Sequence, residues 1–291
     1  MKTTQERDLM SRYDFRKPGV RAVYGIMVVC IVLISLSMLY PFVNTFLNSL
    51  KSTKEFFAFP APFFPSHWLW GNYKESLTYL NVGLHFKNTL LIFAGSALFS
   101  LTVLGLAAFG LAHLRVPFKK WVALYFLSTL LIPSASYLIP NFLNLKNLGL
   151  LNTYWAYWLP SGANAFFLLL LRNFFEGIHK ELFESARIDG ASELRSFLGI
   201  AVPLSAPILV TLLLLGFSSI WNDFYWSSLV MQEDKLPIAG AIYTKIIYAG
   251  STINWNVRFA ILSMTLLPPL FVFLFFQKYI ISGLSVGAVK G

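Results

Sequence analysis

The segment ESARIDGASELRSFLGIAVP, residues 184–203, carries five charged side chains between two long apolar runs. The runs on either side, 148–171 and 204–230, carry a single charge, Asp223. Asp189-Gly190 in the middle of the segment is typical of a helix end, because glycine adopts the left-handed cap conformation at little cost. The segment therefore predicts a polar helical hairpin inserted between two apolar segments.

The composition of the whole chain is that of a membrane protein. Of 291 residues, 56% are hydrophobic and 12% are charged, with a mean hydropathy of +0.63, whereas soluble domains contain about 25% charged residues. A helix that crosses a bilayer needs about 20 apolar residues. Six runs satisfy this need, so we expect an all-α integral membrane protein with six transmembrane helices, at 22–43, 88–112, 121–145, 148–171, 204–230 and 259–277.

The distribution of lysine and arginine predicts the orientation of these helices. Fifteen of the 23 basic residues precede the first run or lie after the second, fourth and sixth runs. Because basic residues favour the cytoplasmic side, both termini are predicted to be cytoplasmic. The first run is too long for the apolar region of a cleavable signal. No basic cluster is interleaved with aromatic residues in a soluble segment, so nucleic acid is not expected as a partner.

The hairpin segment has a helical apolar stripe that begins before residue 184. Phe175, Ile178, Leu182 and Ala186 recur at helical spacing, with charged residues opposite, which predicts an amphipathic helix that ends at Asp189-Gly190. Residues 191–200 are predicted to form a second short helix, and Pro203 to mark the return to the membrane. The residues alone permit two interpretations, a linker that lies on the membrane surface or a docking element for a soluble partner.

This segment resembles the EAA loop of ABC importer permeases. That loop has Glu-Ala-Ala, three residues, Gly, nine residues, Ile, one residue and Leu-Pro. At these positions the chain has Glu184-Ser185-Ala186, Gly190, Ile200 and Val202-Pro203. It departs from the family at Ser185 and Val202, both small or apolar. The motif WNDF (221–224) and the C-terminal sequence FFQKYIISGLSVGAVKG (275–291) are similar to the smaller permease of the carbohydrate-importing, maltose-transporter-type branch.

The resemblance covers about residues 85–291 and implies a fold and a set of partners. The fold would be that of a type I ABC importer permease, with a transmembrane domain at 85–281, a coupling loop at 172–203 and a cytoplasmic tail at 282–291. Residues 1–84 would form a cytoplasmic lead, the first transmembrane helix and an outer loop. The partners would be a second homologous permease, a cytoplasmic ATPase dimer, an extracytoplasmic solute-binding protein and membrane lipid, all at the bacterial cytoplasmic (inner) membrane.

The function implied is import of an oligosaccharide or polysaccharide by alternating access. This chain would be a multi-pass transport subunit and not an enzyme, and it contains no phosphate-binding loop of the type GxxxxGK[ST]. It would bind no cofactor, since ATP and Mg²⁺ would lie on the partner ATPase. Three basic residues on the outer side permit an acidic glycan: Lys235, Lys245 and Arg258.

The resemblance also assigns residues to contacts with the ATPase. The hairpin would be a coupling helix that lies in a groove of the ATPase, with the contact made by Phe183, Glu184, Ala186, Asp189, Gly190, Ile200 and Pro203. The C-terminal tail would reach the ATPase dimer through Gly287, Lys290 and Gly291. A frayed terminus is the alternative for the tail.

Asp223 is the one ionisable residue well inside a predicted span. Because a charge at that depth costs about 2.5–3.5 kcal/mol on insertion scales, it is expected to face the bundle interior or water. Carboxylates, amides and aromatic faces can bind a sugar, which suggests a translocation-pathway group of Trp221, Asn222, Asp223 and Tyr225. The alternative is a carboxylate paired with a neighbouring helix. No catalytic set and no metal-spaced cluster of His, Cys and carboxylates is found.

Two other classes of function remain as alternatives. An ion-coupled secondary transporter would need intramembrane ion ligands and often internal repeats, and an ABC permease could also carry a non-sugar solute. The outer loop after the first run, FFAFPAPFFPSHWLWGNY (56–73), is rich in aromatic residues. It is interpreted as a segment lying at the membrane interface, in preference to a sugar-binding platform.

Overall fold

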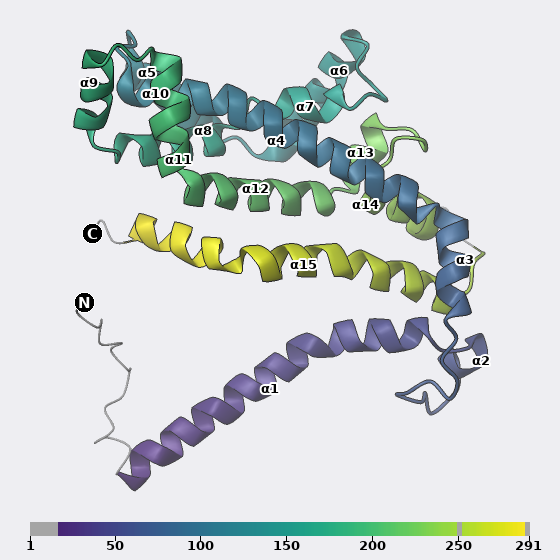
Figure 1. The fold of residues 1–291 in the computed structure, drawn as a ribbon. Coiled ribbons are helices and arrows are strands. Elements are labelled where there is room, and N and C mark those ends of the chain that lie inside the picture. Colours follow the sequence, from purple (N-terminus) through teal and green to yellow (C-terminus); the bar gives the residue numbers. More distant parts are fainter. Residues whose placement is uncertain (1–16, 249–251, 289–291) are drawn as a thin grey trace. The chain divides into compact units, whose positions relative to one another are not determined.

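The computed structural model describes residues 17–248 and 252–288, with side chains as far as residue 277. Within these ranges the chain is helical and contains no strand (Figure 1). It divides into two compact units, one of Met1–Asn72 with Asn254–Ser263 and one of Tyr73–Ile253 with Met264–Gly291. The prediction of an all-α protein is confirmed for the described residues.

The first unit is built on the long helix α1 (Pro18–Ser49), which begins with proline at a position where its missing N–H costs no hydrogen bond. The short helix α2 (Thr53–Phe56) follows, and its start is fixed by a capping box in which Ser52 and Glu55 exchange hydrogen bonds. The first turns of the last helix, α15 (Trp255–Ala288), complete this unit. The most apolar 18-residue stretch of α1 buries none of its residues inside the chain, as expected of a helix whose surroundings are lipid or another protein.

The second unit is a bundle around α4 (Val82–His113). Helices α7 (Trp155–Ser161), α8 (Ala165–Glu176) and α12 (Ala206–Trp221) pack against α4. Its core at one end of α4 is aromatic and aliphatic, and its largest fully buried side chains include Phe175 and Phe183. The remaining helices described are α3 (Gly71–Leu80), α5 (Lys119–Thr129), η2 (Ser134–Tyr137), α6 (Leu138–Asn147), α9 (Lys180–Ile188), α10 (Glu193–Ser196), η3 (Phe197–Ala201), α11 (Val202–Leu204), α13 (Tyr225–Val230), α14 (Ile238–Ile242) and η4 (Tyr243–Tyr248).

Helix length and composition identify the candidate membrane crossings among the described helices. Three described helices, α1, α4 and α15, are long and apolar enough to cross a membrane, and the number rises to five if each of two bent pairs is one span. The predicted third span is broken between α5 and α6 by 97°, next to Pro133. The second bend, of 78°, lies at Ser205, at the start of the predicted fifth span and two residues before Pro207. Proline removes a helix hydrogen bond and clashes with the preceding turn, which accounts for both positions.

The predicted fourth span, 148–171, is divided into two short helices. α7 contains Pro160 and ends at Ser161, and α8 starts after Asn164, whose side chain accepts a hydrogen bond from the N–H of Phe167 at 3.0 Å. Neither helix reaches the length of a span. The expectation of six transmembrane helices is therefore not confirmed and stays a prediction.

Candidate functional site

The predicted hairpin is present as two short helices, α9 and α10, joined by a tight turn at Gly190. Gly190 has φ of +79°, in the left-handed region, and its N–H donates to the carbonyl of Arg187 at 3.0 Å. The N–H of Ala191 donates to the carbonyl of Ala186 at 2.9 Å. This pair of bonds is the Schellman arrangement that ends many helices, so the predicted helix end at Asp189-Gly190 is confirmed.

The two arms of the hairpin are tied together beyond the turn. Ser192 caps α10 by accepting a hydrogen bond from the N–H of Arg195, and Arg187 on α9 forms an ion pair with Glu193 on α10 at 2.8 Å. The Arg187 guanidinium lowers the pKa of the Glu193 carboxyl through this hydrogen bond. Both partners are exposed, so the pair contributes at most about 1 kcal/mol, and its main effect is to fix the angle between the arms.

The inner side of the hairpin is part of the protein's own core. Phe183 is only 2% exposed, and its ring lies 5.6 Å from that of Phe109 and 4.1 Å from that of His113, both on α4. Burial of a phenylalanine side chain stabilises by about 1.5–3 kcal/mol. Phe183 thus fastens α9 to α4, and in this structure it offers no surface to a partner.

The amphipathic helix expected from the apolar stripe is interrupted. Phe175 belongs to the end of α8, and α9 starts only at Lys180, after a turn at 177–179. The carbonyls of Phe174 and Phe175 accept hydrogen bonds from Gly177 and Ile178 at this turn. The expectation of one continuous helix was wrong. Apolar residues can keep a helical spacing in the sequence even where a short turn separates two helices, if the apolar side of each helix packs on the same core.

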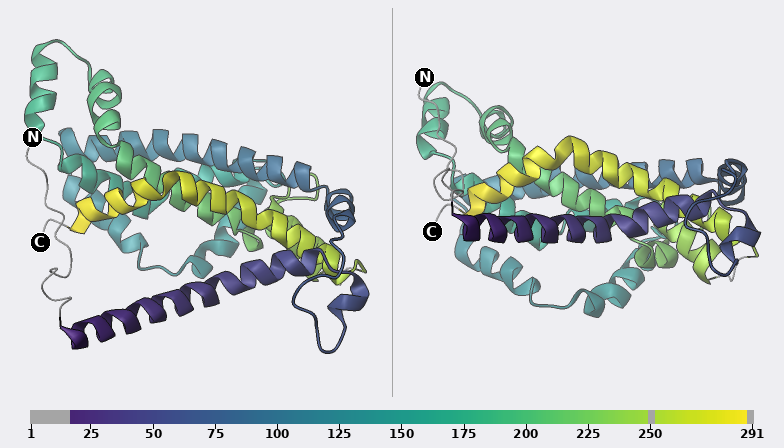
Figure 2. Two further views of the ribbon diagram at one scale, coloured as in Figure 1. Left: turned by 60° about the horizontal axis from the view of Figure 1, so that its bottom comes forward. Right: turned by 90° about the horizontal axis from the view of Figure 1, so that it is seen from below.

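The outer side of the hairpin contains most of the predicted coupling residues. Glu184, Asp189, Gly190 and Pro203 are exposed, and Ala186 and Ile200 are half-buried. Figure 2 shows α9 and α10 projecting beyond the helices that they connect. Leu182 of the predicted apolar stripe is exposed as well. Three more exposed apolar side chains of the hairpin were not among the predicted contact residues: Ile188, Leu194 and Leu198, of which Ile188 is 86% exposed. A large aliphatic residue directly before Asp189-Gly190 was the signal that could have identified Ile188.

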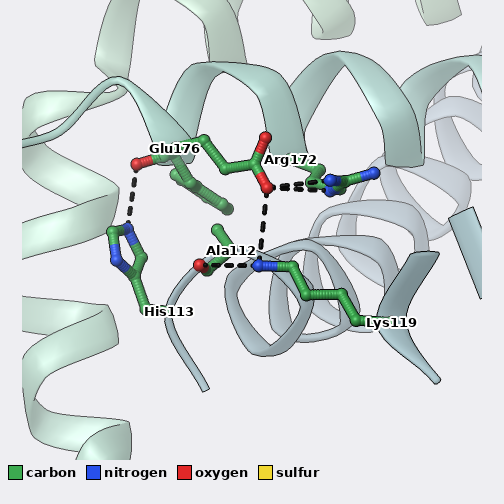
Figure 3. A network of polar contacts seen from close by, with 6 residues as sticks. Ala112, His113, Lys119, Arg172 and Glu176 are labelled. Carbon is green, nitrogen blue, oxygen red and sulfur yellow. Dashed lines mark hydrogen bonds and ion pairs between the residues drawn. The ribbon is translucent and has the colours of Figure 1, made fainter. Parts of the chain in front are cut away.

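A polar network fixes the base of the hairpin (Figure 3). Glu176 at the end of α8 accepts hydrogen bonds from Arg172 at 2.9 and 3.1 Å and lies 3.5 Å from Lys119 of α5. His113 Nε2 at the end of α4 lies 2.9 Å from the carbonyl of Phe175, which suits donation from its N–H. The ends of α4, α5 and α8 are thereby held in register where the hairpin leaves the bundle.

A cavity of about 940 Å³ opens among α4, η2, α6, α7, α8, α12 and α13. Its lining combines apolar side chains with hydroxyl, amide and aromatic groups. The polar and aromatic members are Phe93, Ser96, Ser100, Ser134, Tyr137, Asn141, Tyr157, Ser161, Asn164, Phe166, Phe167, Ser219, Asn222, Asp223, Tyr225 and Trp226. A pocket of this size with a few converging polar groups is typical of a site for a small molecule.

Three of the four predicted pathway residues line this cavity: Asn222, Asp223 and Tyr225. Trp221 does not, because it is buried against Phe86 and Phe217, at ring distances of 5.7 and 5.3 Å, and lines a smaller pocket of about 400 Å³. Sequence position alone could not separate Trp221 from its neighbours, since α12 ends at this residue and the chain then turns.

Asp223 is held by two hydrogen bonds at the cavity wall. The hydroxyl of Tyr157 on α7 donates to Asp223 Oδ2 at 2.5 Å, and the N–H of Trp226 donates to Oδ1 at 3.0 Å. Asp223 is therefore hydrogen-bonded to a neighbouring helix, as the alternative interpretation of this residue predicted. Its position on the wall also leaves it within the group that a solute in the cavity would meet.

The predicted tail contact falls mostly outside the described residues. Gly287 lies in the last turns of α15, while Lys290 and Gly291 lie outside the part of the chain that the structure describes. Among the described side chains, no group of three or more His, Cys, Asp and Glu lies close enough to hold a metal ion.

Comparison with known proteins gives one family. The family model described as "Binding-protein-dependent transport system inner membrane component" matches residues 89–286. Protein LplC of Bacillus subtilis is 38% identical over 167 residues, which are 53% of this chain and 57% of that protein. The sn-glycerol-3-phosphate transport system permease protein UgpE of Pectobacterium atrosepticum is 29% identical over 256 residues, 86% of this chain and 91% of that protein. The diacetylchitobiose uptake system permease protein NgcG of Streptomyces coelicolor is 28% identical over 271 residues, 89% of this chain and 87% of that protein.

A solved structure matches the fold over nearly its whole length. It is the crystal structure of a bacterial ABC transporter involved in the import of the acidic polysaccharide alginate. The TM-score is 0.81 at 26% identity, and the match covers 94% of this chain and 99% of that chain.

Proposed function

The chain belongs to the family of binding-protein-dependent transport system inner membrane components, and from this premise we propose that it is a permease subunit of an ATP-driven oligosaccharide importer. It is a transport component and not an enzyme. The relatives that it resembles over most of their length are transport components as well. The observation that carries the proposal is the match in fold, at a TM-score of 0.81, to a chain of the alginate importer.

The solute that we propose is an acidic oligosaccharide. The alginate importer is named for an acidic polysaccharide, and NgcG for diacetylchitobiose. The cavity is compatible with a glycan, because its hydroxyl and amide groups can exchange hydrogen bonds with sugar hydroxyls and its tyrosines offer aromatic faces. Asp223 is the exception, because an ionised carboxylate repels an acidic solute, and the hydrogen bond from Tyr157 does not remove its charge.

The mechanism proposed for the hairpin is mechanical. A cytoplasmic ATPase dimer, which would hold the ATP and Mg²⁺, would grip the outer side of α9 and α10, where Glu184 and Ile188 are exposed. Buried Phe183 and the Glu176 network would transmit its movement to α4 and α8. A second homologous permease would complete the pathway, and a solute-binding protein would deliver the sugar. The chain would cross the membrane six times with both termini in the cytoplasm and the tail near the ATPase.

The experiment that tests the function is a transport assay on the reconstituted complex. The chain is co-purified with its ATPase and a second permease, placed in liposomes, and supplied with the binding protein and one solute at a time. Alginate oligomers should stimulate ATP hydrolysis and enter the vesicles, while neutral chito-oligosaccharides should do so less. Uptake that follows an ion gradient without ATP would replace the proposal with a secondary transporter.

Glu184→Ala tests the role of the hairpin, with Glu181→Ala as a matched control, since both side chains are exposed on the same helix. We expect Glu184→Ala to lower the sugar transported per ATP hydrolysed and Glu181→Ala to leave this ratio unchanged. Equal behaviour of the two variants would argue against a specific contact at Glu184.

A second candidate solute comes from UgpE, whose name gives sn-glycerol 3-phosphate. That protein matches 86% of this chain at 29% identity. Stimulation of ATP hydrolysis by glycerol 3-phosphate, and not by alginate oligomers, would favour a small phosphorylated polyol as the solute.

A further inference from the structure

The loop that follows α1 exposes an unusual density of aromatic side chains. We call Phe57, Phe59, Phe63, Phe64, Trp68 and Trp70 the aromatic loop surface; all six are exposed, Phe59 completely. Between Ser52 and Trp70 the ionisable side chains are only Lys54, Glu55 and His67. A patch of large apolar groups on an ordered protein surface usually marks a contact with another body.

Hydrogen bonds hold the loop in one defined conformation. Glu55 accepts hydrogen bonds from the N–H groups of Ser52 at 2.9 Å and Ser66 at 2.7 Å, which close the segment between them. Lys51 is buried, and its ammonium donates to the carbonyl of Pro62 at 2.6 Å and to Asn48 at 2.8 Å. These bonds fix the loop from inside, so the exposure of the aromatic side chains is a property of a defined conformation.

One side of the loop is covered by the same unit and the other is not. Phe56 stacks on Trp255 at the start of α15, at a ring distance of 6.1 Å and an angle of 5°, and lies 5.5 Å from Phe259. Phe57 and Phe59 follow directly and remain exposed. Phe56 is therefore the inward anchor, while Phe57 and Phe59 directly after it are exposed.

The loop turns back along α1. The ring of Phe63 stacks on that of Tyr40 of α1, with centroids 6.3 Å apart and an angle of 21°. Tyr40 lies nine residues before Ser49, the end of α1, which is about 13 Å along the helix at 1.5 Å per residue. Tyr40 also lies within the apolar run 22–43, so Phe63 stands at the level of the outer end of that run. In Figure 1 the loop is the dark blue segment next to α2.

From these contacts we infer that the aromatic loop surface docks into the headgroup region of the outer leaflet and anchors the outer end of α1 in the bilayer. We assign lipid as the partner of this surface, because the loop stacks on α1 near the end of its apolar run. The most apolar stretch of α1 has no residue buried by the rest of the chain, so lipid can surround it. Tryptophan and other aromatic rings prefer this depth, where an apolar body meets a polar boundary. A protein contact would be expected to have a more polar rim than this loop provides. The inference rests on the proposed orientation of the chain in the membrane and not on the solute that it carries.

The test uses an environment-sensitive fluorophore attached to single cysteines in the assembled, reconstituted transporter. The native cysteine is removed by Cys30→Ser, and new ones are introduced by Phe59→Cys and Phe64→Cys, each at an exposed position. Lys54→Cys is the matched control, because it is exposed on α2 in the same loop but outside the aromatic loop surface. A complex that carries only Cys30→Ser has no cysteine in this chain, so any fluorescence from it measures the background from labelled cysteines of the other subunits.

We expect labels at positions 59 and 64 to shift their emission to the blue in liposomes without binding protein. Lipids with a quencher near the headgroup should quench them, and aqueous iodide should not. The label at position 54 should show no blue shift, should be quenched by aqueous iodide and should not be quenched by the lipid quencher. Quenching of all three labels by iodide, with protection at 59 and 64 only after the binding protein is added, would overturn the inference in favour of a protein-docking surface.

Discussion

Substitution of Gly190 by alanine is the sharpest test of the hairpin, because the structure isolates a single energetic cause. Gly190 has φ of +79°, and a Cβ placed there meets nothing within 4 Å. The cost of Gly190→Ala is therefore backbone strain alone, about 1–2 kcal/mol for an L-residue in the left-handed region. A change of this size lowers the equilibrium ratio of the native turn to its alternative conformations by a factor of about 5 to 30.

The expected consequence is loss of coupling without loss of the membrane fold. The turn sets the direction of α10 relative to α9, while Phe183 keeps α9 on the bundle whatever the turn does. The variant should insert and assemble, yet transport less solute per ATP hydrolysed in the reconstituted complex. Gly190→Asn should be milder, because asparagine tolerates the left-handed conformation better than alanine does.

Gly199→Ala supplies the matched control. Gly199 lies in the same hairpin, is exposed and has no positive φ, and a Cβ added to it would also meet nothing within 4 Å. Alanine there should leave coupling unchanged. If Gly190→Ala and Gly199→Ala give the same coupling ratio, or if Gly190→Asn is worse than Gly190→Ala, the reasoning from turn geometry fails.

Three further substitutions test other parts of the structure. Gly95→Ala should destabilise the bundle by about 1–3 kcal/mol, because a Cβ at this position would lie 2.1 Å from the Trp158 ring. Gly83→Ala on the same helix is the control, because a Cβ there meets nothing within 4 Å. Thermal unfolding in detergent should show a lower unfolding temperature for Gly95→Ala than for Gly83→Ala. Tyr157→Phe removes the hydroxyl that donates to Asp223 and should cost about 1.5–3 kcal/mol of stability in the same assay, and an unchanged unfolding temperature would contradict this. Hydrogen bonds from Ser66 and from the N–H of Ser52 lower the pKa of Glu55 from 4.5 to about 2. The carboxylate therefore stabilises the loop fully above pH 4.5 and loses this effect as the pH falls toward 2, so the difference in amide hydrogen exchange of residues 52–70 between wild type and Glu55→Gln should narrow over that range.

The parts of the hairpin that follow from local chemistry were predictable from the sequence. Gly190 ends α9 and Ser192 caps α10, because both effects depend on residues a few positions apart. The direction in which an apolar stripe faces was not predictable, since it depends on what packs against it. Phe183 was expected at the ATPase and lies against α4, while exposed Ile188 was overlooked.

The breaks in the apolar runs show a similar limit. Pro133 and Pro160 indicate where a helix can bend or end, but the sequence does not give the 97° bend between α5 and α6. The hydrogen bond between Tyr157 and Asp223 joins residues 66 positions apart. Hydropathy assigns both residues to apolar runs, and only the packing of α7 and of α12 against α4 brings them together.

The path of the chain gives the hairpin two direct routes to the cavity. The first arm is preceded by α8, whose start at Asn164 and Phe167 lines the cavity, and the second arm continues through η3 and α11 into α12, which carries Ser219 on the cavity wall. Each arm is thus connected through the chain to one wall, and both helices pack on α4. A movement imposed on the exposed side of the hairpin would therefore act on α8 and α12 through the chain, and on α4 through the buried ring of Phe183. The rigid ties at Phe183 and Glu176 matter for this reason, because a hairpin that flexed at its base would absorb the displacement before it reached the residues around Asp223.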